Sequence, residues 1–246
     1  MIPINYPVVF SRFTPGDILR LDPQDCRWRM CKDDLELIFR ACGAFWHHPG
    51  KRNPKAPHAI LTSKKHTNIY VNCPKVLQWS NLCQIMARQL MYLLRSYYAG
   101  PIDWVTGSDS SALGLSKDFA NLANARWHPM QKGPEKTQVW EKAVIAPGEW
   151  ILDVEELLTT SLTTQAVYDG IKRGNPTQVN FVPFVPLLVH RPDKGVPEII
   201  SGSKLIWLLD YDTYVVDPDK EECALCKNGS PALLAKENWS RLVATM

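Results

Sequence analysis

Two adjacent glutamates followed by a run of hydroxyl side chains stand out between residues 151 and 165. An apolar segment, Ile151 to Val154, leads into Glu155 and Glu156, and five hydroxyl residues follow: Thr159, Thr160, Ser161, Thr163 and Thr164. Hydroxyls and backbone N–H groups at a helix start can hold a phosphate, because the helix field favours an anion there. Paired carboxylates beside them suit ribose hydroxyls or a metal ion. The simpler alternative is an acidic surface turn with a threonine N-cap.

A second hydroxyl-rich turn lies earlier in the chain. Gly107-Ser-Asp-Ser-Ser111 follows the short apolar run Ile102 to Thr106. Its backbone N–H groups can also take an anion, although a plain helix cap explains the same residues. Both turns therefore follow an apolar segment directly and precede a helical pattern.

A cysteine pair near the C-terminus has the spacing of a zinc site. Cys223 and Cys226 are separated by two residues, but a tetrahedral structural site needs two more ligands. Buried or redox-silent cysteines are the simpler interpretation, so zinc is not expected at this pair. The other candidate ligands, which serve only if segments near both ends of the chain meet, are Cys26 with Cys31 and His47 with His48.

The elements that position these turns change character near residue 100. Before it, helices are predicted at 33–45 and 77–98, and two short β-prone runs flank the polar bend Lys64 to Thr67. After it, apolar strands alternate with helices, which predicts a parallel sheet with helices on its faces. Ligands of such sheets bind at the carboxyl ends of strands, where both turns fall. The predicted strands are 102–106, 151–154, 179–189 and 205–209, and the helices between them are 113–124 and 164–173.

The chain divides into three parts on these patterns. Residues 1–99 form N-terminal helices and a hood segment, 100–209 the core, and 210–246 a C-terminal hood or tail. The polar segment 130–143 is predicted to be a mobile loop.

Composition narrows the class of protein. The chain has 246 residues, of which 45% are apolar, enough for a sizeable core. Its 28 basic and 25 acidic residues are spread along the chain, so the net charge of +3 gives no support for a nucleic-acid partner. No apolar run reaches signal or membrane-span length, and no membrane partner is expected. Seven scattered cysteines favour reduced thiols and hence the cytoplasm.

Five segments, in this order along the chain, resemble the orotate phosphoribosyltransferase family of type I phosphoribosyltransferases. The acid and hydroxyl stretch is similar to the family's phosphoribosyl-pyrophosphate motif, and the cysteine-bearing tail resembles that of some bacterial members. The resemblance extends over about residues 33 to 240. The matching segments are 59–72, 104–111, 138–152, 151–165 and 223–230.

This resemblance implies an α/β fold with a mostly parallel five-stranded sheet, helices on both faces and a small hood. It implies transfer of 5-phosphoribose from phosphoribosyl pyrophosphate to a pyrimidine base, most simply orotate, in pyrimidine biosynthesis. Mg²⁺ would be bound through phosphoribosyl pyrophosphate, and a homodimer would let the mobile catalytic loop close over a neighbouring site. An oxocarbenium-like transition state with a departing pyrophosphate needs positioning and positive charge, not a protein nucleophile.

The resemblance also assigns roles by position. Catalytic roles would fall to Lys132 or Lys136 on the loop and to Glu155 and Glu156 at the ribose hydroxyls. The pyrophosphate would meet Ser108, Asp109, Ser110 and Ser111. The 5′-phosphate would meet Thr159, Thr160, Ser161, Leu162 and Thr163. The base would approach Lys64, Lys65, Tyr70 and Gln165. For the lysines, a solvated surface is the alternative.

Several departures from the family pattern support a second hypothesis, a phosphoribosyltransferase-fold protein that binds nucleotide or phosphoribosyl ligands for regulation without turnover. Ser161-Leu162 replaces glycine in the phosphate turn, where a leucine with positive φ would be costly. Gln165 stands where an arginine usually pairs with the orotate carboxylate. The basic bend reads Ser-Lys-Lys instead of Ser-Gly-Arg, and both acids are glutamates. The retained acids, threonines and lysine-bearing loop favour the enzyme.

Overall fold

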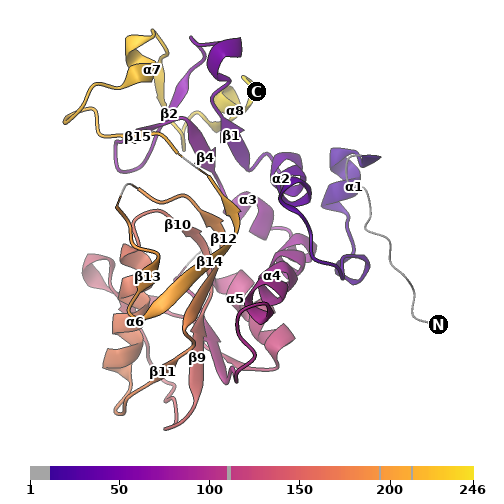
Figure 1. The fold of residues 1–246 in the computed structure, drawn as a ribbon, viewed down its shortest axis with the longest axis vertical. Coiled ribbons are helices and arrows are strands. Elements are labelled where there is room, and N and C mark those ends of the chain that lie inside the picture. The colour runs from indigo at the N-terminus through magenta and orange to yellow at the C-terminus, as the bar shows by residue number, and fades with distance from the viewer. Residues whose placement is uncertain (1–11, 110–111, 194, 212) are drawn as a thin grey trace.

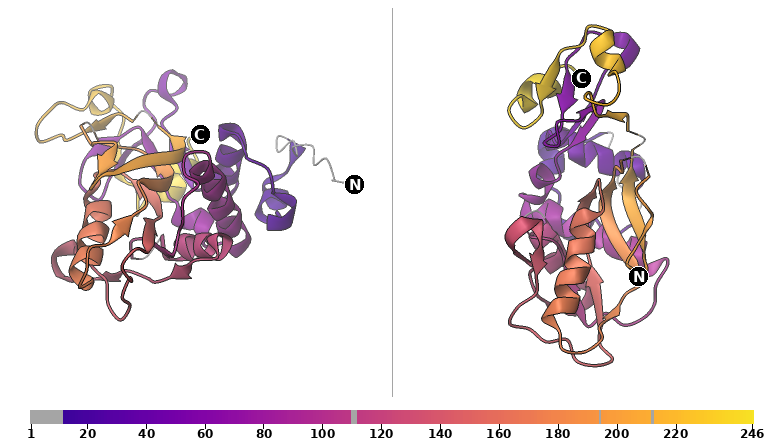
Figure 2. Two further views of the ribbon diagram at one scale, coloured as in Figure 1. Left: turned by 60° about the horizontal axis from the view of Figure 1, so that its bottom comes forward. Right: turned by 90° about the vertical axis from the view of Figure 1, so that its left-hand side faces the viewer.

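The computed structural model describes residues 12–109, 112–193, 195–211 and 213–246. An α/β core forms the lower part of the molecule in Figure 1, and a smaller unit, which we call the hood, lies above it. The hood combines an early and a late segment of the sequence, so purple and yellow ribbons meet there. Figure 2 shows the same two parts stacked along the long axis.

The core is a mostly parallel sheet, as predicted. Strand β9 runs into β10 and β11 runs into β12, so the two stretches of each pair act as one bent ribbon. The ribbons follow the order β6, β5, β9/β10, β11/β12 and β14, all parallel to their neighbours, and β13 adds an antiparallel edge. The strands are β5 (Trp104–Thr106), β6 (Arg126–Trp127), β9 (Trp150–Asp153), β10 (Glu155–Leu158), β11 (Asn180–Phe181), β12 (Phe184–His190), β13 (Ile199–Ile200) and β14 (Ser203–Asp210).

Helices cover both faces of this sheet. Successive strand residues point to opposite faces, and the buried clusters follow that alternation. Val105, Leu152 and Leu188 pack with helices α4 (Ser80–Arg95) and α5 (Ala112–Ala123) on one face. On the other face, the neighbouring residues Trp104 and Ile151 pack with helix α6 (Leu162–Gly174). The predicted apolar stripe of α4 is confirmed, because Leu82, Ile85, Met86, Leu90 and Leu93 are all buried.

The remaining helices precede the sheet or belong to the hood. Helix α2 ends at Ala41, four residues earlier than predicted, because Phe45 begins a strand. These helices and short 3₁₀ turns are α1 (Pro15–Leu19), η2 (Pro23–Asp25), α2 (Lys32–Ala41), η3 (Gly50–Arg52), α3 (Pro74–Leu77), η4 (Pro134–Lys136), α7 (Ala224–Lys227) and α8 (Trp239–Val243). Among the described residues, none of these helices is both long enough and apolar enough to cross a lipid bilayer.

Two short sheets build the hood. One pairs β1 with β4 antiparallel, and the other has the order β15, β3, β2, β16. The second sheet unites residues near position 60 with residues near position 230, so the two end segments do meet. The strands are β1 (Phe45–His47), β2 (His58–Ile60), β3 (His66–Thr67), β4 (Ile69–Val71), β15 (Val215–Val216) and β16 (Ala232–Leu234). The domain boundaries at 99/100 and 209/210 stay a prediction.

One sequence-based expectation about local structure is wrong. Glu155 and Glu156 do not follow the strand: they lie inside β10, which continues because Glu155 is in register with Leu187 of β12. The turn therefore begins only at Thr159. Within the 130–143 segment, β7 (Gln131–Lys132) and β8 (Gln138–Val139) form an antiparallel hairpin, and its mobility stays a prediction.

Candidate active site

Three turns meet at the carboxyl ends of the parallel strands. They follow β5, β10 and β12, and the backbones of the last two are joined where the Asp193 N–H donates to the Thr159 carbonyl at 2.8 Å. We call this region the cradle and define it by Gly107–Asp109, Glu155–Glu156, Thr159–Leu162 and 191–193. The sheet edge thus gathers segments that are far apart in the sequence.

A buried carboxylate ties the first turn to the central strand. Glu155 is 2% exposed and accepts hydrogen bonds from the Ser108 backbone N–H at 2.9 Å and the Ser108 hydroxyl at 2.6 Å. Gly107 is required for this approach, because a Cβ there would lie 2.5 Å from the Val154 carbonyl oxygen. Glu155 is therefore engaged with the Ser108 turn, which leaves the half-buried Glu156 as the more accessible of the two acids.

Asp153, which the sequence did not single out, forms a carboxyl pair with Glu155. The two side chains share one face of the strand, and Asp153 is 1% exposed, with neither carboxylate oxygen hydrogen bonded to a described residue. Burial raises the pKa of Asp153 to about 8, and burial with the adjacent Asp153 charge raises the pKa of Glu155 well above its usual range. Because burial and the neighbouring charge both disfavour a second ionised carboxylate, the pair holds a proton at neutral pH.

The turn after β10 places its backbone strain on Ser161 and not on Leu162. Ser161 has φ +63° and ψ −8°, a left-handed conformation, and it is the N-cap of α6. Leu162 is the first residue of the helix, and its side chain is 73% exposed. The expected conflict at leucine is thus absent from this turn. Thr159 is half-buried and Thr160 and Thr163 are exposed, so their hydroxyls border the N-terminus of a thirteen-residue helix.

Gln165 is held by other residues of the core. Its amide nitrogen donates to the Asp169 carboxylate at 3.1 Å, and its amide oxygen accepts from the Ser201 hydroxyl at 3.1 Å. These partners belong to helix α6 and to the turn before β14. The structure therefore gives Gln165 contacts other than the base contact that its position implied.

The basic bend of the hood reaches the cradle through one ion pair. Lys65 Nζ lies 2.5 Å from an Asp193 carboxylate oxygen, and both side chains are partly buried. Lys64 is exposed with φ +64° and, with Tyr70, lines a cavity of about 240 Å³. The Tyr70 ring packs on Trp239 with centroids 5.3 Å apart. The bend thus brings a paired and an exposed ammonium to the same side of the molecule.

A buried arginine, also missed from the sequence, joins the hood to the core. Arg191 follows β12, is 4% exposed, and donates from Nη1 to the Ile69 carbonyl at 3.0 Å. Burial lowers its pKa, while the nearby Asp193 opposes that effect. Its only sequence signal is its place directly after a buried strand.

The turn after β5 contacts the hairpin that carries the candidate catalytic lysines. The Asp109 N–H donates to the Gln138 amide oxygen at 3.2 Å, and the Gln138 amide nitrogen donates to the Asp109 carboxylate at 2.6 Å. Lys132 and Lys136 are exposed on this hairpin. Ser110 and Ser111, the other predicted members of the turn, lie outside the described residues.

The cysteine pair has ligand neighbours that the sequence analysis did not identify. Cys223 and Cys226 lie with His58 and His66 in one group within the hood, which we call the hood cluster. Two further ligand-type side chains, His58 and His66, thus lie beside the pair. The candidates weighed from the sequence, Cys26 with Cys31 and His47 with His48, are not in this group.

Comparison with known proteins gives consistent likenesses. The chain is 28% identical over 174 residues to an orotate phosphoribosyltransferase of Caldanaerobacter subterraneus, a match that covers 71% of this chain and 85% of that protein. It is 26% identical over 205 residues to the orotate phosphoribosyltransferase of Pelotomaculum thermopropionicum, covering 83% of this chain and 96% of that protein. No family model matches the chain.

Solved structures agree at the level of the fold. The UMP synthase of Leishmania donovani superposes with a TM-score of 0.57 at 14% identity over 88% of this chain; the chain spans 41% of that protein's length. The orotate phosphoribosyltransferase of Aeropyrum pernix superposes with a TM-score of 0.52 at 14% identity, covering 72% of this chain and 93% of that one.

Proposed function

We propose that this chain, which has the type I phosphoribosyltransferase fold and is related to the orotate phosphoribosyltransferases, transfers 5-phosphoribose from phosphoribosyl pyrophosphate to a pyrimidine base, with orotate the first choice. One observation carries the proposal. The hydrogen bonds from Ser108 to Glu155 fasten the turn after β5 to the ribbon that leads to the turn after β10. In this proposal the turn after β5 holds the pyrophosphate and the turn after β10 holds the 5′-phosphate, so that both serve one site.

In this proposal the substrate lies across the cradle. The 5′-phosphate takes the N-terminus of α6 with the hydroxyls of Thr159, Thr160 and Thr163, because the helix end and the hydroxyl donors favour an anion. Glu156 accepts from the ribose hydroxyls. The left-handed Ser161 supports this placement, because the turn adopts the backbone that a glycine would otherwise supply.

The pyrophosphate requires a local rearrangement. Both N–H groups described in its turn already bond to side chains, Ser108 to Glu155 and Asp109 to Gln138. The bond from the Asp109 N–H to Gln138 is neutral and 3.2 Å long, so it is weaker than the bond from Ser108 to Glu155, although the Gln138 amide also donates to the Asp109 carboxylate at 2.6 Å. Pyrophosphate would displace Gln138 and free the hairpin, so that Lys132 or Lys136 can approach the departing charge.

The oxygen donors of the cradle fit a magnesium ion bound through the substrate. The carboxylates of Asp109 and Glu156 are hard oxygen ligands, and Mg²⁺ is held in such sites by one or two carboxylates together with substrate phosphates. When bound, the ion neutralises charge on the departing pyrophosphate. Lys65 and Lys64 supply positive charge near the base, which suits an anionic pyrimidine such as orotate.

A turnover assay tests the proposal. Purified protein is mixed with phosphoribosyl pyrophosphate, Mg²⁺ and orotate, uracil or a purine base, and pyrophosphate release is followed. Release is expected with orotate. If none of these bases gives release while ribose 5-phosphate still binds in calorimetry, the enzyme is excluded and a binding protein without turnover remains.

A single substitution tests the ribose site within this scheme. Glu156→Gln should weaken binding of phosphoribosyl pyrophosphate about tenfold or more, because a charge-assisted hydrogen bond is lost. The matched control is Glu141→Gln, an exposed glutamate outside the cradle. Equal affinities of wild type and Glu156→Gln would mean that the ribose lies elsewhere.

We also propose a homodimer in the cytoplasm, in which the hairpin lysines serve the neighbouring site. Mixing the inactive variants Lys136→Ala and Glu156→Gln should then restore part of the activity, because mixed dimers contain one intact site. A mixture as inactive as its components, with light scattering showing monomers, would contradict the shared site.

A further inference from the structure

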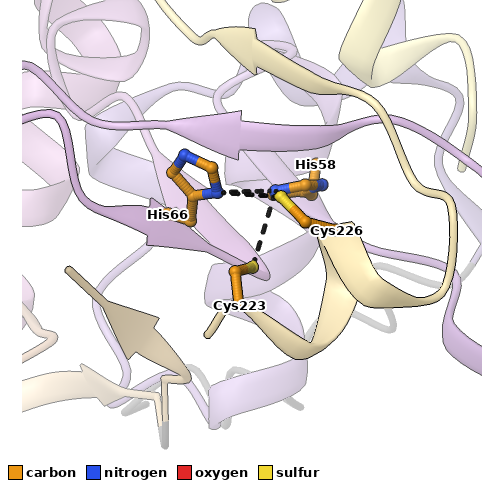
Figure 3. A group of neighbouring side chains, drawn as sticks. All are labelled: His58, His66, Cys223 and Cys226. Carbon is orange, nitrogen blue, oxygen red and sulfur yellow. Dashed lines mark hydrogen bonds between the residues drawn. The ribbon is translucent and has the colours of Figure 1, made fainter. Parts of the chain in front are cut away.

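Four ligand-type side chains of the hood cluster face one another, although they come from distant parts of the sequence. His58 lies on β2, His66 on β3, Cys223 just before α7 and Cys226 within α7. Their side chains point toward a common centre in Figure 3, and one ligand atom from each lies within 4.8 Å of all the others. We propose that this cluster binds a structural zinc ion through His58 Nε2, His66 Nδ1 and the two thiolates.

The separations between these atoms have the size of tetrahedral edges. His58 Nε2 is 3.0 Å from His66 Nδ1, and Cys226 Sγ is 3.4 Å from His66 Nδ1 and 3.6 Å from His58 Nε2. Cys223 Sγ is 3.8 Å from His58 Nε2. With zinc–nitrogen and zinc–sulfur bonds of ordinary length, a tetrahedron has nitrogen–nitrogen edges of about 3.3 Å and nitrogen–sulfur edges of about 3.6 Å. One ion at the centre would therefore reach all four atoms with small adjustments.

The hydrogen bonds around His58 leave the correct nitrogen available. The Ser230 hydroxyl donates its proton to the Ala56 carbonyl at 2.5 Å, so its oxygen can only accept from His58 Nδ1, which lies 2.8 Å away. Nδ1 thus carries the proton, and Nε2 presents its lone pair to the cluster. A second partner that fixes the tautomer in this way is typical of metal-ligating histidines. His58 is fully buried, which favours its neutral form.

The local chain is shaped to hold both cysteines. The Lys227 N–H donates to the Cys223 carbonyl at 3.0 Å and the Gly229 N–H to the Cys226 carbonyl at 2.9 Å, forming a tight turn after the pair. Gly229 has φ +78°, which a residue with a side chain rarely adopts. This turn returns Ser230 to His58. The same short segment therefore places both cysteines and brings the Ser230 hydroxyl to His58.

The donor set selects the metal and its role. Two sulfur and two imidazole ligands in a tetrahedron favour zinc over the oxygen-seeking ions Mg²⁺ and Ca²⁺. Four protein ligands leave no open position for a substrate, so the site is structural. It ties the β2–β3 hairpin to the C-terminal segment, and His66 is adjacent to Lys65, which pairs with Asp193 of the cradle. Under the proposed function, zinc would thus keep Lys65 at the base site.

Metal analysis of the untagged, full-length protein tests the site directly. Protein purified without chelators should contain close to one zinc ion per chain. Cys226→Ser should lose most of that zinc, whereas the matched control Cys42→Ser, a cysteine outside the cluster, should retain it. Cys226→His keeps a ligand and should retain zinc even if the serine variant fails to fold.

A spectroscopic probe checks the geometry. Cobalt added to protein freed of zinc should give the intense absorption of a tetrahedral ion with thiolate ligands, and Cys226→His should shift that absorption. Less than about a tenth of a zinc ion per wild-type chain together with only the weak bands of six-coordinate cobalt, or iron in place of zinc, would overturn the proposal.

Failure of the metal site and failure of the proposed function can be distinguished, because metal content and activity are measured separately. Zinc-loaded protein without turnover would contradict the proposed function and leave the metal site intact. Turnover by wild-type protein that contains no zinc would contradict the metal site and leave the function intact.

Discussion

The cradle and the hood cluster bury polar groups in opposite ways. In the cradle, the Glu155 carboxylate receives two hydrogen bonds from Ser108, a partner supplied by the same chain. In the hood cluster, two imidazole nitrogens and two sulfurs turn lone pairs toward one centre, and residues 58 and 226 are 168 positions apart. The Glu155 carboxylate thus finds its partners within the chain, whereas the hood cluster gains its best partner from outside the chain.

Because of this difference, the stability of the two regions should depend on different solution conditions. The cradle contains a carboxyl pair that keeps a proton, so its stability depends on pH through burial of acids. The hood cluster binds metal only through deprotonated ligands, so its stability depends on metal and rises as protons leave. The two regions should therefore respond to pH with opposite signs, which makes them separable by experiment.

The largest expected effect tests the cradle. The pKa of Asp153 is about 8 in the folded protein, against an ordinary 3.8, so the folded state holds a proton that the unfolded chain releases. The free energy of unfolding should therefore fall as pH rises from about 4 to about 8, by on the order of 1.4 kcal/mol per pH unit at most. Asp153→Asn should reduce this slope relative to wild type, as measured by urea unfolding of both proteins with zinc in excess.

An exposed aspartate provides the control. Asp219→Asn, in an exposed turn, should keep the wild-type slope. If Asp153→Asn also keeps it, the carboxyl pair does not hold a proton and the contrast with the hood cluster fails. Omitting zinc should remove the opposing pH dependence of the hood cluster, in wild type and variant alike.

A smaller effect tests the link between the two regions. Lys65→Ala removes the ion pair with Asp193 and should raise the KM for orotate about tenfold, because a charged contact near the base is lost. Stability should change by about 1 kcal/mol or less, since the pair is only partly buried. The measurement is steady-state kinetics with orotate as the varied substrate, combined with urea unfolding.

A second ion pair serves as the matched control. Lys32 pairs at 3.2 Å with Asp210, the last residue of the core strand β14, outside the cradle. Lys32→Ala should leave the KM for orotate unchanged. Equal KM values for both variants would show that Lys65 only fastens the hood and does not serve the base.

The sequence predicted the cradle better than the hood cluster, for a physical reason. The turns after β5 and β10 are contiguous motifs, and parallel strands bring their carboxyl ends together by rule. Asp153 and Arg191 were missed because charged residues inside or after buried strands have no periodic signature until their neighbours are known. The end of the strand was misplaced for the same reason, since pairing of Glu155 with Leu187 overrides its charge.

The hood cluster illustrates the limit of local patterns. The Cys223 and Cys226 spacing was recognised, but its partners depend on a sheet that pairs β2 with β3 and with β16. His58 and His66 are separated by seven residues, outside the spacing of common zinc motifs, so only the folded hood identifies them. The spacing of residues along the sequence does not predict which distant strands pair, and this pairing brings the histidines to the cysteines.

The smallest expected effect tests how the phosphate turn tolerates a side chain. Ser161 holds φ +63° without the freedom of glycine, so Ser161→Gly should raise the free energy of unfolding by about 0.5 kcal/mol, the relief of a left-handed residue less the entropy of glycine. Lys142→Gly is the matched control, because Lys142 has φ +67° on an exposed loop. Both variants should gain similar stability in urea unfolding. Only Ser161→Gly should also change the KM for phosphoribosyl pyrophosphate, by several-fold, because only that backbone borders the 5′-phosphate; an identical change in both variants would place the phosphate elsewhere.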